Sequence, residues 1–380
     1  MNRKLKVSCS EDGSSDKRSL PLQMDESSPP CHAEDESLDL LRLRDGDRQI
    51  VFDPSASTFT CGVSGTGACD AGKSTLAKQV RLIHDKGFSD VDKTHYRNVV
   101  RANLATSLLR VLEAMRDTEY AFTGELVAVA DKLSRALNDN LAHLNILDLK
   151  LEVHMLVGHA NFHRFLETSD NIGLAESTQY FFKSVDRILS PSFMPTDYDI
   201  LRARQKNLGL AETVFHFRGF HIRLCDVDGT STLKKKWLDC FETVSAVLFT
   251  VGLDTYDVRS KENDDKTDLV VALDSLSVLC RHPSFAETPF ILFLNKRDIF
   301  RSKLKVTPLS AVMPAYKGSN DYTEAAAYVK KLFEQQSGGK KNFWVHVTCA
   351  IDTASVRGVF DSVLSVIFQS TLEEVAPKPH

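Results

Sequence analysis

An eight-residue segment, Gly67–Ser74 (GACDAGKS), constrains the fold of this chain more than any other feature of its sequence. It matches G-x-x-x-x-G-K-[S/T], in which backbone N–H groups and the positive end of the following helix bind phosphate. The pattern predicts a strand at Thr58–Ser64 and a helix at Lys73–His84, which is the context such a loop requires. A chance match at this composition occurs on the order of one time in a hundred. We therefore expect a phosphate-binding loop, with Lys73 neutralising phosphate oxygens and Ser74 binding Mg²⁺.

The rest of the chain changes between strand and helix patterns in an order that favours an α/β fold. Between residues 90 and about 190, apolar residues recur at helical spacing and strong strand signals are absent. After Pro195 the pattern predicts a hairpin around Arg218-Gly219, then buried strands separated by helices, then a last amphipathic helix. The predicted elements are strands at Val214–Phe217, Phe220–Cys225, Ser245–Val251, Phe290–Leu294 and Phe343–Val347, and a helix at Val356–Leu372. This order indicates a mostly parallel sheet with flanking helices, interrupted by an all-α block after the first strand–helix unit.

Composition excludes several other classes of protein. The chain has 380 residues, a net charge of −4 and no long apolar segment, so neither nucleic-acid binding nor a membrane channel is expected. None of its eight cysteines forms a C-x-x-C pair, which argues against a disulfide scaffold and a zinc module. No apolar signal core follows Met1, so we expect a cytoplasmic protein. Residues 1–38 are rich in Ser, Asp, Glu and Pro, which predicts a mostly disordered tail over residues 1–45 with a short helix around Glu36–Arg44.

A second segment, Asn295-Lys296-Arg297-Asp298, follows the predicted strand at Phe290–Leu294 and bears on which nucleotide binds. The Asp298 carboxylate can accept two hydrogen bonds, as the N1–H and N2 amine of guanine require, and adenine lacks this donor pair. The Lys296 stem can lie along the purine face, Asn295 can brace the loops, and the Ala350 N–H can donate to the guanine O6. Taken alone, the segment could be a solvated turn after a strand. Together with the phosphate loop, it favours GTP or GDP over ATP.

These motifs and their order resemble the heterotrimeric G-protein α subunits. The resemblance covers roughly residues 60–372, in order and at similar spacing. The segments that carry it are Lys73–His84, Leu201–Arg204, Asp226–Gly229 with Lys235-Lys236-Trp237, Phe290–Asp298, Gly318–Asn320, Glu324–Tyr328 and Thr348–Thr353. It implies a Ras-like GTPase domain over residues 50–87 and 200–380, interrupted by an all-α helical domain over residues 88–199 that clamps nucleotide against it.

Position by position, the resemblance implies a guanine nucleotide site with Mg²⁺. Arg204 resembles the arginine that stabilises charge on the transferring phosphoryl group, although without the family it would be interpreted as a surface arginine in a basic run. Asp226 resembles a carboxylate that holds a metal-bound water, and Gly229 resembles the glycine whose N–H meets the γ-phosphate. Nucleotide contacts are implied for Gly67, Ala68, Cys69, Asp70, Ala71, Gly72, Lys73, Ser74, Thr75, Leu201, Arg202, Asp226, Gly229, Asn295, Lys296, Asp298, Cys349 and Ala350, and metal contacts for Ser74, Asn207 and, through water, Asp226.

Several departures from the family pattern fall on positions that carry its chemistry. Thr230 stands where the family has the glutamine that orients the attacking water, and its side chain is too short for the same reach. Asp228 replaces a glycine and adds a carboxylate near a polyanion. Cys69 replaces a glycine of the phosphate loop, unless a small insertion shifts the alignment there. Asn207 replaces the Mg²⁺-binding threonine and needs a different coordination geometry.

Two hypotheses about function follow from these departures. The first is a GTP/GDP switch downstream of a receptor, with Arg204 supporting slow hydrolysis and Thr230 failing to orient water. The second is a G-α-like interaction module that binds guanine nucleotide but hardly hydrolyses it. Single-turnover hydrolysis distinguishes them.

The resemblance also implies a βγ dimer and a seven-helix receptor as partners, while the effector cannot be identified from the sequence. Lys234–Trp237 fits the βγ-binding surface of the family, whereas the Ser-rich N-terminal region does not fit its N-terminal contact. The segment Glu373–His380 lacks the usual receptor-contacting ending. No glycine follows Met1, so the N-myristoylation signal is absent. Cys9, behind a basic cluster, is either a palmitoylation site at the cytoplasmic face of the plasma membrane or an unmodified thiol.

Overall fold

The computed structural model describes residues 58–64, 71–140, 145–168, 177–205, 210–217, 220–227, 245–260, 263 and 265–375. The chain divides into two units, Met1–Pro54 and Ser55–His380. The first unit, and with it the tail and the short helix expected at Glu36–Arg44, lies outside the described residues. Everything below concerns the second unit.

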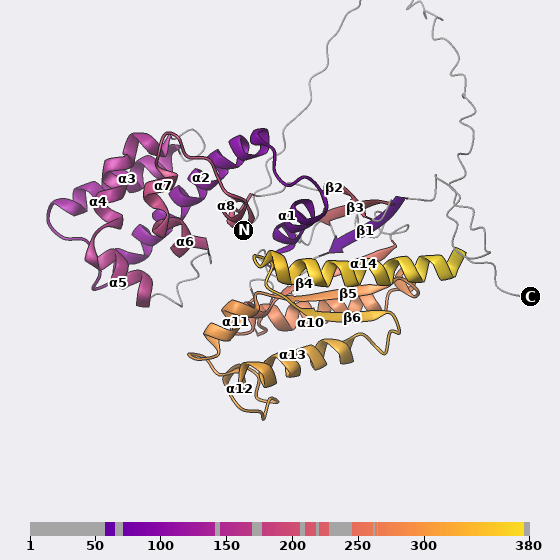
Figure 1. The fold of residues 1–380 in the computed structure, drawn as a ribbon. Helices are drawn as coiled ribbons and strands as arrows, with labels where there is room; N and C mark the ends of the chain where they lie inside the picture. The colour runs from indigo at the N-terminus through magenta and orange to yellow at the C-terminus, as the bar shows by residue number, and fades with distance from the viewer. Residues whose placement is uncertain are drawn as a thin grey trace, which may run out of the picture. The chain divides into compact units, whose positions relative to one another are not determined.

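A six-stranded sheet in the order β2-β3-β1-β4-β5-β6 forms the centre of this unit (Figure 1). Its strands are β1 (Thr58–Ser64), β2 (Leu210–Phe217), β3 (Phe220–Val227), β4 (Ala246–Gly252), β5 (Phe290–Asn295) and β6 (Phe343–Val347). Strands β3, β1, β4, β5 and β6 run parallel, and β2 pairs antiparallel with β3 at one edge as the predicted hairpin. Loops at the carboxyl ends of such parallel strands are where α/β sheets bind ligands.

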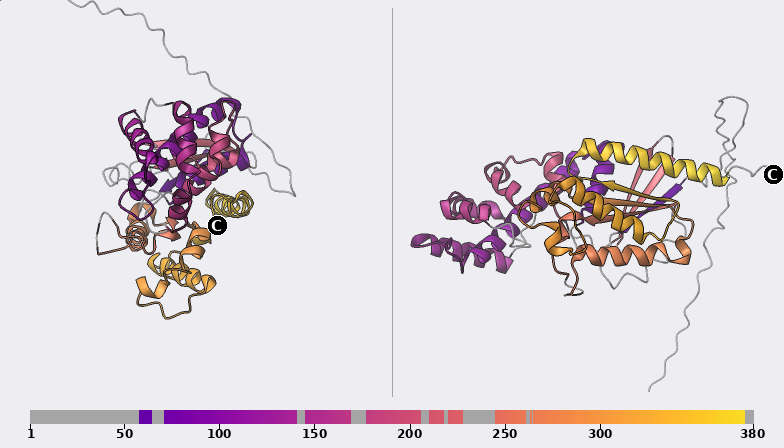
Figure 2. Two further views of the ribbon diagram at one scale, coloured as in Figure 1. Left: turned by 90° about the vertical axis from the view of Figure 1, so that its left-hand side faces the viewer. Right: turned by 90° about the horizontal axis from the view of Figure 1, so that it is seen from below.

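Helices cover both faces of the sheet, which explains why β4 and β5 are buried along their whole length. On one face lie α1 (Lys73–His84) and α14 (Thr353–Val375), and on the other lie α10 (Asp268–Cys280) and α13 (Tyr322–Gln336) (Figures 1 and 2). Successive strand residues pack into opposite layers, so Leu248 joins the α1–α14 core while Phe249 joins the α10–α13 core. Four short elements complete this side: η4 (Leu253–Thr255), η5 (Pro283–Phe285), α11 (Arg297–Lys303) and α12 (Leu309–Val312).

A block of helices follows α1 and has a hydrophobic core of its own (Figure 1). Its elements are α2 (Asp90–Met115), α3 (Glu125–Asn140), η2 (Ile146–Leu149), α4 (Lys150–Val157), α5 (Ala160–Thr168), α6 (Ser177–Lys183) and α7 (Val185–Ile188). The long helix α2 begins with a capping box, in which Ser89 and Asp92 bond each other's backbone N–H groups. The short helix α8 (Asp197–Arg202) then leads the chain back to β2.

The fold class expected from the sequence, a Ras-like α/β domain interrupted by an all-α domain, is confirmed. Within the described residues, α1 and β6 have the predicted bounds. The hairpin strands are longer than predicted: β2 begins at Leu210 and β3 ends at Val227, because these residues pair with each other across the hairpin. Helix α14 likewise begins at Thr353 and continues to Val375. Of the helices that can be described, none is long and apolar enough to cross a membrane.

Candidate nucleotide site

A pocket of about 400 Å³ lies where α1, α2 and α8 meet the loops that follow β5 and β6. Among the described residues that line it are six Lys and Arg side chains and one carboxylate, which suits a polyanionic ligand. The cations are Lys73, Lys78, Arg110, Arg202, Arg204 and Lys296, and the carboxylate is Asp298.

The backbone at Gly72, at the start of α1, has a shape that only glycine adopts without strain. Its φ is +94°, and a Cβ at this position would lie 2.2 Å from Nδ2 of Asn295. Asn295 is 2% exposed, and its Nδ2 donates to the carbonyl of Ala71 at 2.9 Å. The end of the phosphate loop is therefore built against the Asn295 side chain.

Asn295 also holds the loop that follows β6. Its Oδ1 accepts the Ala350 N–H at 2.8 Å and faces the Thr348 hydroxyl at 3.4 Å. From α1, the Gln79 amide donates to the Ala350 carbonyl at 2.7 Å. Since the Ala350 N–H is engaged by Asn295, the contact with a guanine O6 expected from the sequence would require this donor to change partner.

Lys296 and Asp298 occupy the turn between β5 and α11. Lys296 has φ +62°, a left-handed conformation, and its Nζ lies 2.9 Å from Oδ2 of Asp254. The Arg297 N–H donates to the Thr348 carbonyl at 3.1 Å, which joins this turn to the β6 loop. Asp298 lies in the first turn of α11 with its side chain exposed at the pocket.

Helix α1 is joined to α8 by direct contacts at the pocket. The Lys78 ammonium donates to the carbonyls of Ile200 at 2.9 Å and Ala203 at 2.5 Å, at the carboxyl end of α8. The Thr75 hydroxyl faces the Leu201 carbonyl at 3.4 Å. Burial lowers the pKa of Lys78 to about 8. These contacts place Leu201 and Arg202 beside the start of α1.

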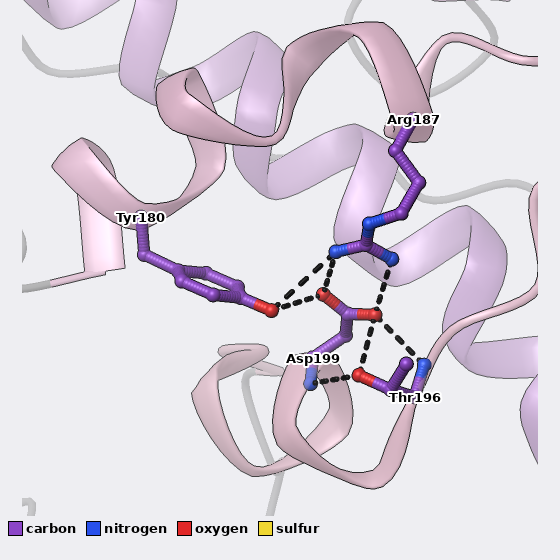
Figure 3. A network of polar contacts seen from close by, with 4 residues as sticks. All are labelled: Tyr180, Arg187, Thr196 and Asp199. Atoms are coloured by element: carbon purple, nitrogen blue, oxygen red, sulfur yellow. Dashed lines mark hydrogen bonds and ion pairs between the residues drawn. The ribbon is translucent and has the colours of Figure 1, made fainter.

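A network around Asp199 fixes the beginning of α8 (Figure 3). The Asp199 carboxylate is fully buried and accepts two hydrogen bonds from Arg187, one from the Tyr180 hydroxyl, and one each from the N–H and the hydroxyl of Thr196. Burial opposes ionisation of this group, but the hydrogen bonds outweigh it and the pKa of Asp199 is lowered. The same carboxylate and the Thr196 hydroxyl form a capping box, so the network also satisfies backbone N–H groups at the start of α8.

The residues after α8 are held from the helical block. The side-chain amide of Asn103 on α2 forms two hydrogen bonds with the backbone of Arg204. Arg202 stacks over Tyr180 and Tyr198, and its carbonyl accepts the Ser177 hydroxyl at 3.1 Å. The pocket wall on this side therefore depends on both the sheet domain and the helical block.

The structure brings most of the predicted nucleotide contacts together and leaves others outside what it describes. The predicted residues that line the pocket are Ala71, Gly72, Lys73, Ser74, Thr75, Leu201, Arg202, Arg204, Asn295, Lys296, Asp298, Cys349 and Ala350. Those outside the described residues are Gly67, Ala68, Cys69, Asp70, Asn207, Gly229 and Thr230. For Asp226 the structure gives the backbone, which pairs with Val63 near the end of β1.

Several residues at the site escaped the sequence analysis. For Lys78 a signal existed, because it follows Ser74 by four residues and so lies on the same face of α1. The Thr196-x-x-Asp199 spacing is that of a capping box, which could have predicted the start of α8. Nothing in the sequence distinguishes Asn103, Tyr180 or Arg187 from other polar residues of amphipathic helices.

The described residues fit a guanine nucleotide. The glycine-only backbone at Gly72, the lining cations and the exposed Asp298 are the features that phosphates and a base with paired donors require. Ser74, in the first turn of α1 and on the wall of the pocket, has a hydroxyl that would bind Mg²⁺.

Comparison with known proteins agrees with this site. The family model "G-protein alpha subunit" matches residues 46–367. The "Guanine nucleotide-binding protein alpha-4 subunit" of Caenorhabditis elegans is 34% identical over 318 residues, which is 80% of this chain and 88% of that protein. The chain therefore belongs to the G-protein α subunit family, whose members are guanine nucleotide-binding signal transducers and GTPases.

Proposed function

We propose that this chain is a GTP/GDP switch that binds nucleotide with Mg²⁺ and hydrolyses GTP slowly, downstream of a receptor. The observation that carries the proposal is the combination of a retained arginine with a lost glutamine. Arg204 lines the pocket with Lys73 and Ser74, whereas Thr230 occupies the position that matches the family glutamine.

The proposed roles follow from the chemistry of each group. Backbone N–H groups at the start of α1 and the Lys73 ammonium bind the phosphates, and Asp298 selects the base. Arg204 stabilises charge that develops on the γ-phosphoryl group. When bound, Mg²⁺ would neutralise charge on the β- and γ-phosphate oxygens. The Thr230 side chain is too short for its hydroxyl to orient water as a glutamine does, so the chemical step is slow.

Single-turnover GTP hydrolysis by the full-length chain tests this proposal. Thr230→Gln is expected to raise the rate at least about tenfold, and Arg204→Ala to lower it by roughly a thousandfold or more. A wild-type rate that Thr230→Gln leaves unchanged would show that Thr230 does not limit hydrolysis. A wild-type rate that Arg204→Ala leaves unchanged would remove Arg204 from the mechanism.

The second candidate is a module that binds guanine nucleotide without appreciable hydrolysis and acts through its partners. Thr230, Asp228 and Cys69 favour it, because all three depart from the family at the reacting phosphate. Tight binding of GTPγS, together with no hydrolysis of GTP by either wild type or Thr230→Gln, would support this alternative.

Nucleotide-dependent switching can be followed through tryptophan fluorescence. The chain has two tryptophans, Trp237 in the Lys234–Trp237 segment and Trp344 on β6. In a Trp344→Phe background, a working switch is expected to change the Trp237 signal when Mg²⁺ is added with GTPγS. Binding without a change in signal would favour the static module, and no binding at all would exclude both candidates.

Partners and location belong to the proposal as well. We propose a βγ dimer that contacts Lys234–Trp237, and a receptor at the cytoplasmic face of the plasma membrane. Membrane association would depend on these partners or on a lipid attached to Cys9. Co-sedimentation with liposomes, with and without βγ and with Cys9→Ser, separates the two routes.

A further inference from the structure

The side chain of Asn103 pairs with the backbone of Arg204 as one strand residue pairs with another. The Arg204 N–H donates to Asn103 Oδ1 at 2.5 Å, and Asn103 Nδ2 donates to the Arg204 carbonyl at 2.8 Å. In an antiparallel ladder, two residues exchange both of these bonds in the same way. A single hydrogen bond would let the Arg204 peptide rotate about it, but two bonds prevent that rotation. The Asn103 amide therefore fixes both the position and the direction of the Arg204 backbone.

Asn103 projects from a rigid support. It lies on α2, whose neighbouring residues Leu104 and Leu108 are fully buried in the core of the helical block. The pocket-facing residues of α2 are Asn103, Thr106 and Arg110, which follow one another at the three- and four-residue spacing of one helix face. A site residue supported in this way is held more precisely than one on a loop.

The backbone leaves the α8 helix immediately before Arg204. Ala203 has φ −66° and ψ 128°, an extended conformation, and its N–H makes the last bonds of the helix, to Asp199 and Ile200. Lys78 and Ser177 bind the carbonyls of Ile200, Arg202 and Ala203, all of which precede Arg204. The Asn103 amide therefore binds the backbone of Arg204 at the point where the hydrogen bonds of helix α8 end.

We propose that Asn103 is a positioning residue for hydrolysis, which sets the backbone of Arg204 so that its guanidinium reaches the γ-phosphoryl group. The inference rests on the proposed function, in which Arg204 stabilises the developing charge. Such stabilisation requires groups that are already oriented when the reaction begins. A displacement of about 1 Å in a reacting group can cost on the order of a hundredfold in rate. By this route the helical block contributes to catalysis as well as to enclosing the nucleotide.

The first test measures the hydrogen bonds directly, without turnover. Amide hydrogen exchange at Arg204 is compared in GDP-bound wild type, Asn103→Ala and Asn98→Ala. Asn98 is an exposed asparagine on the same helix and serves as the matched control. Asn103→Ala is expected to speed exchange of the Arg204 amide at least about tenfold, with α1 amides and the Asn98→Ala profile unchanged. Unchanged exchange at Arg204 would overturn the inference.

The second test is a cycle of single-turnover hydrolysis rates with Asn103→Ala, Arg204→Ala and the double variant. Each is made in the wild-type chain and in the Thr230→Gln chain, so that a faster background is included. Asn103→Ala is expected to slow hydrolysis by roughly ten- to a hundredfold, with GTPγS affinity within about threefold of wild type. In the Arg204→Ala background the same change is expected to alter the rate by less than about twofold, because Asn103 acts through Arg204.

The outcomes separate the two proposals. If Arg204→Ala slows hydrolysis but Asn103→Ala does not, Asn103 has no positioning role. The same conclusion follows if Asn103→Ala slows hydrolysis as much in the presence of Arg204→Ala as in its absence. If Arg204→Ala has no effect, the arginine of the proposed function is wrong, whatever the amide exchange shows. If no background turns over, the proposed GTPase activity and the catalytic role of Asn103 are both overturned, and amide exchange alone decides whether Asn103 holds the Arg204 peptide.

Discussion

Arg187 binds the carboxylate of Asp199 with both of its terminal nitrogens, at 2.8 Å to Oδ2 and 2.7 Å to Oδ1 (Figure 3). The Asp199 side chain is 0% exposed, whereas that of Arg187 is 42% exposed. The pair therefore joins a fully buried charge to one that water still reaches. Since Asp199 also caps α8, the pair connects the helical block to the helix that carries Leu201 and Arg202 to the pocket.

Removing Arg187 should destabilise the fold by leaving this carboxylate buried with only neutral donors. Arg187→Ala is expected to lower the free energy of unfolding by about 2–3 kcal/mol, below the cost of breaking a fully buried pair because Arg187 is partly solvated. The control is Arg116→Ala, whose partner Asp131 lies 3.5 Å away with both side chains mostly exposed. That change is expected to cost less than about 0.5 kcal/mol. Urea unfolding followed by circular dichroism measures both, and equal effects would contradict the prediction.

The partly buried Lys78 should make stability depend on pH above neutrality. Its pKa is lowered by burial to about 8, against 10.5 for an unperturbed lysine. Between these two values the unfolded chain binds more protons at this group, so its contribution to stability rises with pH. Below pH 8 the cost of burying the charge is constant.

Comparison with Lys78→Met isolates this titration from the others. From pH 8 to 10.5, the unfolding free energy of wild type is expected to rise relative to Lys78→Met by on the order of 2–3 kcal/mol. Lys150→Met, at an exposed position on α4, should follow the wild-type pH profile. Parallel pH profiles for wild type and Lys78→Met would show that burial does not perturb Lys78 in this way.

Elements with a strong local signal could be predicted from the sequence alone. The apolar run Phe290–Leu294 and the helix that begins at Lys73 appear in the structure where the pattern places them. The first half of β2, Leu210–Thr213, has no such signal, and it becomes a strand because it pairs with β3. Boundaries set by tertiary pairing cannot be predicted from local periodicity.

The same distinction holds at the candidate site. Gly72, Lys73 and Asn295 belong to contiguous motifs, so their meeting in one pocket was predictable from the sequence. Asn103 contacts a residue 101 positions away, and in the sequence it looks no different from the exposed Asn98 on the same helix. Only the packing of α2 against the residues that follow α8 gives one of these two asparagines a partner at the pocket.

Gly72 should tolerate no side chain. In Gly72→Ala the left-handed backbone costs about 1–2 kcal/mol, and the new Cβ would displace Asn295 from the Ala71 carbonyl. A total near 3 kcal/mol corresponds to roughly a hundredfold loss of GDP affinity. Titration with a fluorescent GDP analogue measures it. Gly358→Ala, on α14 where a Cβ meets nothing within 4 Å, should leave affinity unchanged, and wild-type affinity in Gly72→Ala would contradict the assigned loop.

Asp298 should determine the preference for guanine over a base that lacks the exocyclic amine. Its exposed carboxylate lies at the pocket, where it can accept both the N1–H and the N2 amine of guanine, while hypoxanthine offers only N1–H. Because a hydrogen bond to a charged group contributes about 1.5–3 kcal/mol, wild type is expected to prefer GTP over ITP by roughly ten- to a hundredfold. Asp298→Ala should weaken both nucleotides and bring their affinities together, whereas Asp265→Ala, at an exposed position after β4, should keep the preference. Competition binding against labelled GDP measures each affinity, and a preference for GTP that survives in Asp298→Ala would place base recognition elsewhere in the pocket.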